Sequence, residues 1–219
     1  MVDNPLNHKI EFIKGVGPNK AAALKKELGI SQLKDMLDFF PFRYEDRSQI
    51  LKITDIDDNT NAGLYMIQVI SKKKAGRYRG KSLKVSVKDS TGYAELVWMK
   101  GIEWVEDKMV TGKRYIIYGK PKIIKEKVSF FHPEFGDKST MPMGLRPVYP
   151  SSENLKRRFI NNRFFNRIIE EIISKTKQHI KENLSGELIQ NLSLISKSDA
   201  VINMHLPKSF AHIKEAIRR

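Results

Sequence analysis

Residues 83–104 combine a regular alternation of apolar and polar side chains with an end rich in large apolar groups. Alternate positions of the first half are apolar and the positions between them are polar: Leu83, Lys84, Val85, Ser86, Val87 and Lys88. This period of two indicates a β-strand with one buried face. Residues 89–92 (Asp-Ser-Thr-Gly) follow as a turn, because Asp can hydrogen-bond its own backbone and Gly accepts a positive φ. A second strand begins at Tyr93, so the stretch is predicted to form a β-hairpin.

The same pattern predicts five short strands between residues 51 and 150, at residues 65–70, 83–87, 93–99, 114–118 and 127–131. Turn residues separate them, at Gly76, residues 89–92, Gly112 and residues 119–121. Five short strands with this spacing fit a small Greek-key β-barrel of the oligonucleotide-binding (OB) type. An SH3-like barrel would show the same periodicity and stays open as an alternative.

Helical periodicity replaces the strand pattern on both sides of the barrel. Residues 1–50 hold two helical patterns, the second with apolar side chains at i, i+3, i+4 and i+7: Leu33, Met36, Leu37 and Phe40. After residue 151 a longer apolar stripe is expected to cover either the N-terminal helices or the barrel: Leu155, Phe159, Ile160, Phe164, Ile168, Ile169, Ile172 and Ile173. We therefore predict an α+β chain with a helical segment at 1–50, a five-stranded OB barrel at 51–150 and a helical segment at 151–219.

Net charge narrows the class of partner. Forty Lys and Arg residues against 25 Asp and Glu residues give a net charge of +15. Such an excess favours a polyanion, because neutralised phosphates release counterions and supply affinity that does not depend on sequence. Nucleic acid is the first candidate and an anionic membrane surface the second.

Several classes of site are excluded or unsupported. The chain has no cysteine, which removes disulfides, thiolate metal sites and cysteine nucleophiles. His132 with Glu134, His205 and His212 lack further ligands at suitable spacing, so they are expected to be structural. We predict no catalytic residue, no cofactor site and no metal site. The N-terminus lacks a signal-peptide core, and no apolar run is long enough to span a membrane, which together favour a cytoplasmic protein.

Residues 71–81 form the most basic part of the predicted barrel. Its six cations have no acidic neighbour in sequence and are candidates for phosphate contacts: Lys72, Lys73, Lys74, Arg77, Arg79 and Lys81. Tyr78 lies among them and could stack on a base, since cations and a flat ring are what such a loop needs. A solvated surface loop is the plainer interpretation. Gly80-Lys81-Ser82 does not complete a phosphate-binding P-loop, because Ala75 stands where its first glycine is required.

The far end of the hairpin carries Trp98, Met99 and Trp104, with Lys100 between them as a further phosphate contact. Large apolar groups among lysines could stack on nucleobases, or they could fill the barrel core. Strict alternation places Trp98 on the core face with Leu96 and places Met99 on the opposite face. A β-bulge near the strand end would turn both side chains outward.

Basic and glycine-rich features also occur in the helical segments. Gly15-Val16-Gly17 precedes a helix, as in one half of a helix-hairpin-helix DNA-binding motif, where free helix amides can bind phosphate. A tight turn between packed elements would need the same glycines. The C-terminal segment carries a set of cations that either contact DNA or are solvated: Lys156, Arg157, Arg158, Arg163 and Arg167.

Six short blocks, in order, resemble the N-terminal region of the RecG family of ATP-dependent branch-migration DNA helicases. They are GVGPNKAAALKKELGI, DMLDFFPFRYEDRS, KDSTGYAELVWM, FHPEF, RPVYP and DAVINMHLP, which together span nearly the whole chain. The resemblance implies a wedge domain, an OB barrel between helical segments that holds stalled replication forks or Holliday junctions and splits their strands.

In that family two neighbouring aromatic residues after the Asp-x-x-Gly turn stack on bases at the branch point. Trp98 and Met99 stand at the matching positions. Met99 departs from the pattern, because a thioether has no π face and would act instead as an apolar wedge. Trp104 is our own addition to this set.

The resemblance further implies a monomeric bacterial DNA-repair and recombination protein, cytoplasmic and associated with the nucleoid, whose partner is branched DNA. ATP and Mg²⁺ would serve a helicase motor that follows the wedge, and this chain carries no cofactor and no ATPase motif of its own. The chain would therefore be the catalytically inactive DNA-binding fragment of an enzyme. A stand-alone OB protein for single-stranded nucleic acid, and a module that docks an acidic protein, stay open as alternatives.

Overall fold

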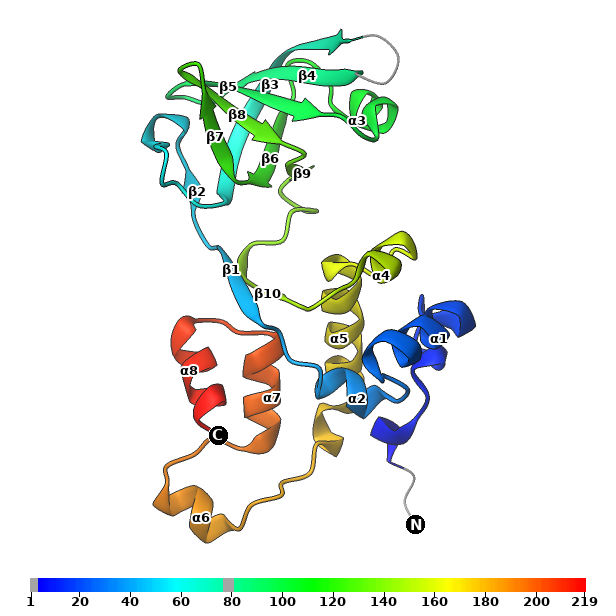
Figure 1. The fold of residues 1–219 in the computed structure, drawn as a ribbon. Helices are drawn as coiled ribbons and strands as arrows, with labels where there is room; N and C mark the ends of the chain where they lie inside the picture. Colours follow the sequence, from blue (N-terminus) through cyan, green and yellow to red (C-terminus); the bar gives the residue numbers. More distant parts are fainter. Residues whose placement is uncertain (1–3, 77–80) are drawn as a thin grey trace. The chain divides into compact units, whose positions relative to one another are not determined.

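The computed structural model describes residues 4–76 and 81–219, which form two compact units (Figure 1). Unit 1 comprises Met1–Glu45 and Leu145–Arg219, and unit 2 comprises Asp46–Gly144. Strands β1 (Arg43–Arg47) and β10 (Gly144–Val148), in which the chain passes from one unit to the other, pair as a two-stranded sheet. The helical segments before and after the barrel thus belong to one unit.

Unit 2 is a curled sheet of eight strands in the described residues, with one helix and one 3-10 turn (Figure 1). Its elements are β2 (Ile50–Leu51), η3 (Ile53–Asp55), β3 (Gly63–Ala75), β4 (Ser82–Lys88), β5 (Tyr93–Trp98), α3 (Ile102–Lys108), β6 (Arg114–Gly119), β7 (Pro121–Ile124), β8 (Lys127–Phe131) and β9 (Glu134–Gly136). The order β7-β8-β5-β4-β3-β6-β9, with β2 beside β3, contains the run β6-β3-β4-β5. A fourth strand that returns beside the first defines a Greek key, as the OB prediction requires.

All five predicted strands are present, as β3, β4, β5, β6 and β8. The mixed fold class is therefore confirmed. The prediction of five strands is wrong, because β2, β7 and β9 extend the sheet with runs of two to four residues that are too short to show a periodicity.

The core of unit 2 follows the predicted alternation. Buried side chains from facing positions of β4 and β5 meet inside the curled sheet: Leu83, Val85, Val87, Ala94, Leu96 and Trp98. Tyr65 from β3 and Phe130 from β8 join them, with ring centroids 4.9 Å apart in an edge-to-face arrangement. Apolar burial of this kind is the main stabilising contribution in a barrel of this size.

The Asp89 side chain ties the β4–β5 turn to the segment before β3. Its Oδ1 accepts hydrogen bonds from the backbone amides of Thr91 and Gly92, and its Oδ2 accepts one from the amide of Ile53 at 2.9 Å. Burial alone would raise the pKa of Asp89, but these hydrogen bonds together lower it. Gly92 does not use the left-handed conformation that we expected. It supplies space, because a methyl group there would lie 3.1 Å from Cγ2 of Ile53.

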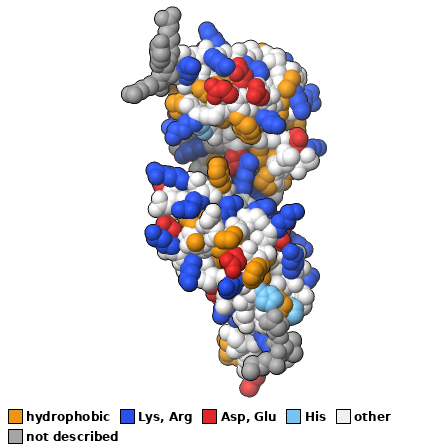
Figure 2. Space-filling view, turned by 90° about the vertical axis from the view of Figure 1, so that its right-hand side faces the viewer, with side chains coloured by type: hydrophobic (Ala, Val, Ile, Leu, Met, Phe, Trp, Pro, Cys, Tyr) orange, Lys and Arg blue, Asp and Glu red, His pale blue; other side chains and the backbone are white. Residues whose placement is uncertain are grey.

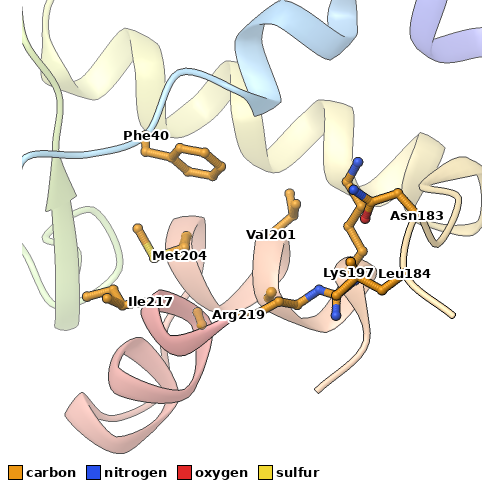
Figure 3. Close-up of a pocket in the computed structure, with 10 residues that line it drawn as sticks. Phe40, Asn183, Leu184, Lys197, Val201, Met204, Ile217 and Arg219 are labelled. Atoms are coloured by element: carbon orange, nitrogen blue, oxygen red, sulfur yellow. The ribbon is translucent and has the colours of Figure 1, made fainter. Parts of the chain in front are cut away.

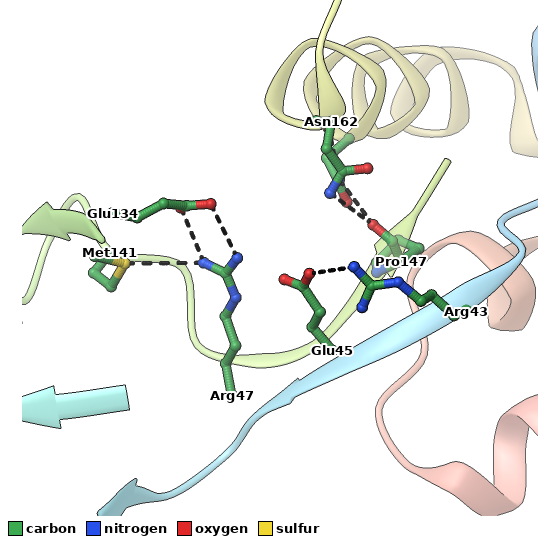
Figure 4. A network of polar contacts seen from close by, with 8 residues as sticks. Arg43, Glu45, Arg47, Glu134, Met141, Pro147 and Asn162 are labelled. Carbon is green, nitrogen blue, oxygen red and sulfur yellow. Dashed lines mark hydrogen bonds and ion pairs between the residues drawn. The ribbon is translucent and has the colours of Figure 1, made fainter. Parts of the chain in front are cut away.

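The buried guanidinium of Arg47 is held inside unit 2 (Figure 4). It makes two hydrogen bonds to the Glu134 carboxylate, of 3.2 and 3.3 Å, and lies 3.7 Å from the centroid of the Tyr118 ring. This bidentate geometry with a ring beneath it suits Arg better than Lys. A second ion pair of β1, from Arg43 to Glu45, lies within unit 1. Glu134 is thus a structural residue, as the sequence predicted.

Unit 1 is helical. Its elements in the described residues are η1 (Pro5–Asn7), η2 (Ile10–Phe12), α1 (Gly17–Leu28), α2 (Leu33–Leu37), α4 (Glu153–Arg157), α5 (Asn162–Thr176), η5 (Lys177–His179), α6 (Gly186–Asn191), α7 (Lys197–His205) and α8 (Phe210–Arg218). The apolar face of α5 supplies Phe165, Ile169 and Ile172 to a core that also holds Leu24 of α1 and Met36 of α2. The stripe of α5 therefore packs against the N-terminal helices, one of the two predicted partners.

The predicted C-terminal stripe is interrupted between α4 and α5. Phe159 was assigned to the buried face, but its side chain is 78% exposed and its φ is +60°. The polypeptide ends α4 with a left-handed turn at this residue and restarts at the N-cap Asn161, whose side chain accepts from the amide of Phe164. A break of one turn shifts the helical phase, so a single continuous stripe was the wrong expectation.

His205 lies at the end of α7 and is fully buried. Its Nε2 lies 2.8 Å from the carbonyl oxygen of Leu37, which can only accept, so Nε2 carries the proton. Nδ1 then accepts from the Tyr149 hydroxyl at 2.9 Å. Burial lowers the pKa of His205 to about 4 and raises the pKa of Tyr149. The neutral imidazole thus joins α2, α7 and the chain after β10, a structural role as predicted.

Replacing Asp89 with Ala should lower the free energy of unfolding by about 1–2 kcal/mol, because amides of two chain segments lose their acceptor. Urea denaturation at pH 7 measures this change. Asp57→Ala is the matched control, since Asp57 accepts from residues of its own exposed loop and its loss should have a smaller effect. Equal effects of the two substitutions would contradict the proposed tie.

Stability should also fall as pH is lowered from about 6.5 towards 4. In that range the unfolded chain protonates its histidine, whereas folded His205, with its pKa lowered to about 4, does not. The stabilisation is complete above the unfolded pKa, and about 3 kcal/mol is lost across the window. Urea denaturation at several pH values checks this. His205→Gln should show a shallower dependence between pH 6.5 and 4, and an unchanged slope would contradict it.

Candidate DNA-binding surface

Trp98 lies in the core of unit 2, with a side chain only 4% exposed. The register of β4 with β5 continues without a shift up to the pair Leu83 and Trp98, so no bulge turns the ring outward. Its nearest ring is that of Phe135, edge-on at 5.8 Å between centroids. The prediction that Trp98 stacks on a base is therefore corrected, because the side chain is buried. Trp98 fills the core, which is the other outcome that alternation allowed.

Met99 is the first residue beyond β5, and its side chain is 54% exposed. Its backbone amide donates to Nε2 of His132 at 3.3 Å, which holds the strand end against the chain after β8. Lys100 is exposed beside it, and Gly101 with φ +64° then turns the chain into α3. Met99 is thus exposed while Trp98 is buried, which is the division that strict alternation predicted.

Trp104 lies on α3, and its side chain is 59% exposed. Ile102 and Val105 on the other face of α3 are buried in the core of unit 2. The Phe135 ring lies between the two tryptophans, 5.8 Å from Trp98 and 5.4 Å from Trp104. The Phe135 ring therefore packs against both the buried Trp98 ring and the exposed Trp104 ring.

The described lysines of residues 71–81 do not share one role. Lys72 donates to the carbonyl oxygen of Glu106 on α3 at 2.8 Å, and Lys74 forms an ion pair with the Glu106 carboxylate. The hydrogen bond to Glu106 raises the pKa of Lys74. These two cations hold the long end of β3 to α3. Lys73 and Lys81 are exposed and have no ion pair among the described residues. Predicted contacts at Arg77, Tyr78 and Arg79 lie outside the described residues.

Phe131 was not among the predicted site residues, although it lies beside the end of β5. It pairs in register with Val97, its ring is 40% exposed, and Nζ of Lys122 lies 5.8 Å from the ring centroid. The alternation of β8, with Phe130 inward and Phe131 outward, could have revealed it. Its proximity to Met99 could not be foreseen, because it depends on the parallel pairing of β5 with β8.

The Gly15-Val16-Gly17 turn of unit 1 has positive φ at both glycines, +87° and +60°. Val16 is buried in the core, and α1 begins without a side-chain hydrogen bond at its N-cap. The element before the turn is the 3-10 turn η2 and not an α-helix. The tight-turn interpretation therefore accounts for these glycines, and phosphate binding there stays a prediction.

One cavity of unit 1 has a largely apolar lining. A hollow of about 380 Å³ in unit 1 lies beside Phe40, Met204 and Ile217 (Figure 3). Its charged lining residues are Lys197 and Arg219, and the Arg219 guanidinium pairs with Glu182. The described lining residues include no Asp, Glu or His that could act as an acid or a base. Within the part of the chain that the structure describes, no group of three or more His, Asp and Glu residues could hold a metal ion.

Positive charge is spread over the face of the molecule that Figure 2 shows. In Figure 2, Lys and Arg side chains are distributed over both units, with scattered Asp and Glu and with apolar groups between them. Across residues 4–76 and 81–219, no helix has the length and apolar character needed to cross a bilayer.

The family model described as the RecG wedge domain matches residues 9–176. The ATP-dependent DNA helicase RecG of Thermotoga maritima is 29% identical over 98% of this chain and 27% of its own length. That of Streptococcus pneumoniae is 29% identical over 98% of this chain and 30% of its own length. The chain thus spans less than a third of these relatives.

Among solved structures, RecG bound to a three-way DNA junction matches with a TM-score of 0.80 and 28% identity. The match covers 99% of this chain and 29% of that chain, so helices and curled sheet both have counterparts there. Because the family model covers well over half of the chain, from before the first long helix to the end of α5, the chain belongs to the RecG wedge domain family.

Proposed function

We propose that this chain is the DNA-binding wedge of a RecG-type ATP-dependent helicase, which binds branched DNA and separates strands at the branch point. One observation carries the proposal: exposed apolar side chains, Met99 and Trp104, flank the exposed Lys100 at the end of the β4–β5 hairpin. Membership of the RecG wedge family supports it, as does the likeness to a RecG structure bound to a three-way junction.

The wedge would work by apolar contact at the branch. Met99 would cover the last base pair of an arm, because a flexible thioether can follow the face of a base pair without stacking on it. Trp104 would stack on a base that has become unpaired. Its contact with the Phe135 ring would limit the movement of the Trp104 side chain. Trp98 would act from within the core, by packing against the Phe135 ring that contacts Trp104.

Phosphate contacts would come from cations that the fold leaves at the surface. Lys73, Lys81 and Lys100 are exposed and would hold the backbones of the arms, together with Arg77 and Arg79. Lys72 and Lys74 would act indirectly, by fixing α3 and hence Trp104 through Glu106. Backbone contacts of this kind supply affinity without sequence preference, as a junction-binding protein needs.

The chemistry of ATP would belong to the rest of the full-length protein. Relatives named as ATP-dependent helicases are more than three times as long as the matched region, which leaves room for a motor that uses ATP and Mg²⁺. We place the whole protein as a monomer on chromosomal DNA in the bacterial cytoplasm, in repair and recombination.

The 219-residue chain by itself should therefore show no DNA-stimulated ATP hydrolysis. A coupled phosphate-release assay with fork DNA and Mg²⁺ tests this. The expected rate equals that of the buffer, and turnover above it that persists in independently purified samples would contradict the assignment of the motor to the remaining protein.

Replacing Met99 and Trp104 together with Ala should weaken binding to a synthetic fork about tenfold while leaving a linear duplex unchanged, because stacking contributes about 1–3 kcal/mol per base. Fluorescence anisotropy with both DNAs measures the ratio. Tyr93→Ala is the matched control, since Tyr93 is 72% exposed at the opposite end of β5.

A fork preference that survives the double substitution would show that these side chains are not the wedge. A linear single strand should bind the unaltered protein more weakly than the fork does. If the single strand binds more tightly than the fork, the chain is a single-strand-binding module instead.

A further inference from the structure

Phe159 occupies a position at which glycine is normally found. Its amide donates to the carbonyl of Lys156 at 2.9 Å, and the amide of Ile160 donates to the carbonyl of Leu155 at 2.9 Å. These two hydrogen bonds form a Schellman motif at the end of α4, in which the residue corresponding to Phe159 takes the left-handed conformation. Its φ is +60°, which for a bulky residue without special local bonding is a strained conformation.

Folding of unit 1 does not explain the phenyl ring. The side chain is 78% exposed, and the described residues place no other aromatic ring against it. Leu155 and Ile160, the two neighbours that close the motif, are fully buried and supply its apolar contact. Glycine would make the same turn without strain, so packing within unit 1 does not require the ring.

Cations surround this turn in sequence and in space. Arg157 and Arg158 precede Phe159 and are exposed. A groove between α1 and α4 includes Arg158 in its lining, and its other charged lining residues are Lys26 and Glu27. An aromatic ring beside arginines, with solvent above it, is the arrangement used to stack a base while holding its phosphates.

A second pair of cations converges at the N-terminal end of α5. Lys20 donates to the carbonyl oxygen of Gly15 at 3.2 Å, and its Nζ lies 5.0 Å from the centroid of the Phe164 ring. A methyl group placed on Gly15 would lie 2.6 Å from a terminal nitrogen of Arg167, so that guanidinium reaches the same glycine. Among the described residues neither cation is paired with a carboxylate.

Glu27 is the acidic group built into this face of unit 1. Its carboxylate accepts from the Ser152 hydroxyl at 2.6 Å and from the Asn154 amide at 3.3 Å. These two hydrogen bonds lower the pKa of Glu27. The charges of Lys26 and Arg158 lower it further, so Glu27 lies near Arg158, at the opposite end of α1 from the Gly15 turn.

We propose that the face of unit 1 formed by the α4–α5 turn and the start of α5 is a second DNA-binding surface. The Phe159 ring stacks on an unpaired base, and Arg157 and Arg158 hold the adjoining phosphates. Lys20 and Arg167 contact the phosphates of the neighbouring duplex. The inference rests on the proposed function only in taking DNA as the ligand, and it does not depend on Met99 or Trp104.

The charge of this face favours DNA over a polypeptide as the occupant. Arg157, Arg158 and Arg167 are exposed on this face, and Lys20 is partly exposed. A partner protein would have to be strongly acidic to match these four cations, whereas a nucleic-acid strand carries a phosphate at every residue.

Phe159→Gly gives a test in which stability and binding change in opposite directions. Thermal unfolding should show a Tm equal to or above that of the unaltered chain, because glycine relieves the strained turn. Fluorescence anisotropy should show binding to an oligo-dT strand and to a fork with a single-stranded arm weakened about tenfold, with a linear duplex unchanged. Phe159→Tyr keeps the ring and should bind as before.

Phe210→Ala is the control for loss of an exposed ring in the same unit, since Phe210 is 54% exposed at the start of α8. It should leave all three affinities unchanged. If Phe159→Gly keeps its single-strand affinity, or if Phe210→Ala loses as much, the surface is not a DNA contact and the proposal is wrong.

The phosphate contacts have a separate signature. Lys20→Gln with Arg167→Gln should weaken binding to all three DNAs and reduce the slope of log affinity against log salt by about 2. Lys208→Gln with Lys214→Gln removes the same charge from exposed positions at α8 and should leave the slope nearly unchanged. Equal slopes for the two pairs would overturn this part. The wedge is judged by the ratio of fork to duplex affinity, so either proposal can fail alone.

Discussion

The period-two alternation of β5 is the constraint on which the DNA-facing end of unit 2 depends. Because Leu96 and Trp98 must both point inward, the apolar bulk at the strand end is divided between core and surface. Met99, the next residue, is exposed, and Gly101 with its positive φ then turns the chain into α3. The Phe135 ring packs against both Trp98 and Trp104, so the exposed Trp104 ring contacts the aromatic side chains of the barrel core.

Electrostatics in this chain divide into charges that the fold uses and charges that it leaves for a partner. Lys72 and Lys74 meet Glu106, and Arg47 is buried against Glu134, so part of the excess of cations stabilises local geometry. The net charge of +15 therefore does not mark a binding site by itself. Lys73, Lys81 and Lys100 are exposed and have no ion pair with a carboxylate among the described residues. Within the same residues Lys20 and Arg167 also lack such a pair, although Lys20 is only partly exposed.

Hydrogen bonds in unit 1 connect residues that lie far apart in the sequence. His205 bonds to Leu37 and Tyr149, which brings the end of α7 to residues more than fifty positions away. The amphipathic α5 forms the centre of that core. Where α4 ends in a Schellman turn, the helical phase is reset and one aromatic ring is left outside. A left-handed turn thus moves Phe159 from the predicted core to the surface.

Local periodicity determined a large part of this protein. The five central strands, the turn at residues 89–92, the apolar face of α5 and the mixed fold class all followed from the order of apolar and polar residues, because backbone geometry sets periods of 2 and 3.6. The ordered motifs were enough to indicate the family. The inward facing of Trp98 was already one of two outcomes that alternation allowed.

Only the tertiary structure decided which side chains the surface displays. Trp104 is supported by Phe135, Met99 by His132, and Lys74 is paired with Glu106, and each partner lies about thirty residues away in the chain. Contacts across such distances depend on strand order, and short edge strands such as β2 and β9 depend on their neighbours more than on their own residues. The hydrophobic pattern places a residue on a face of an element, whereas its burial depends on what that face meets.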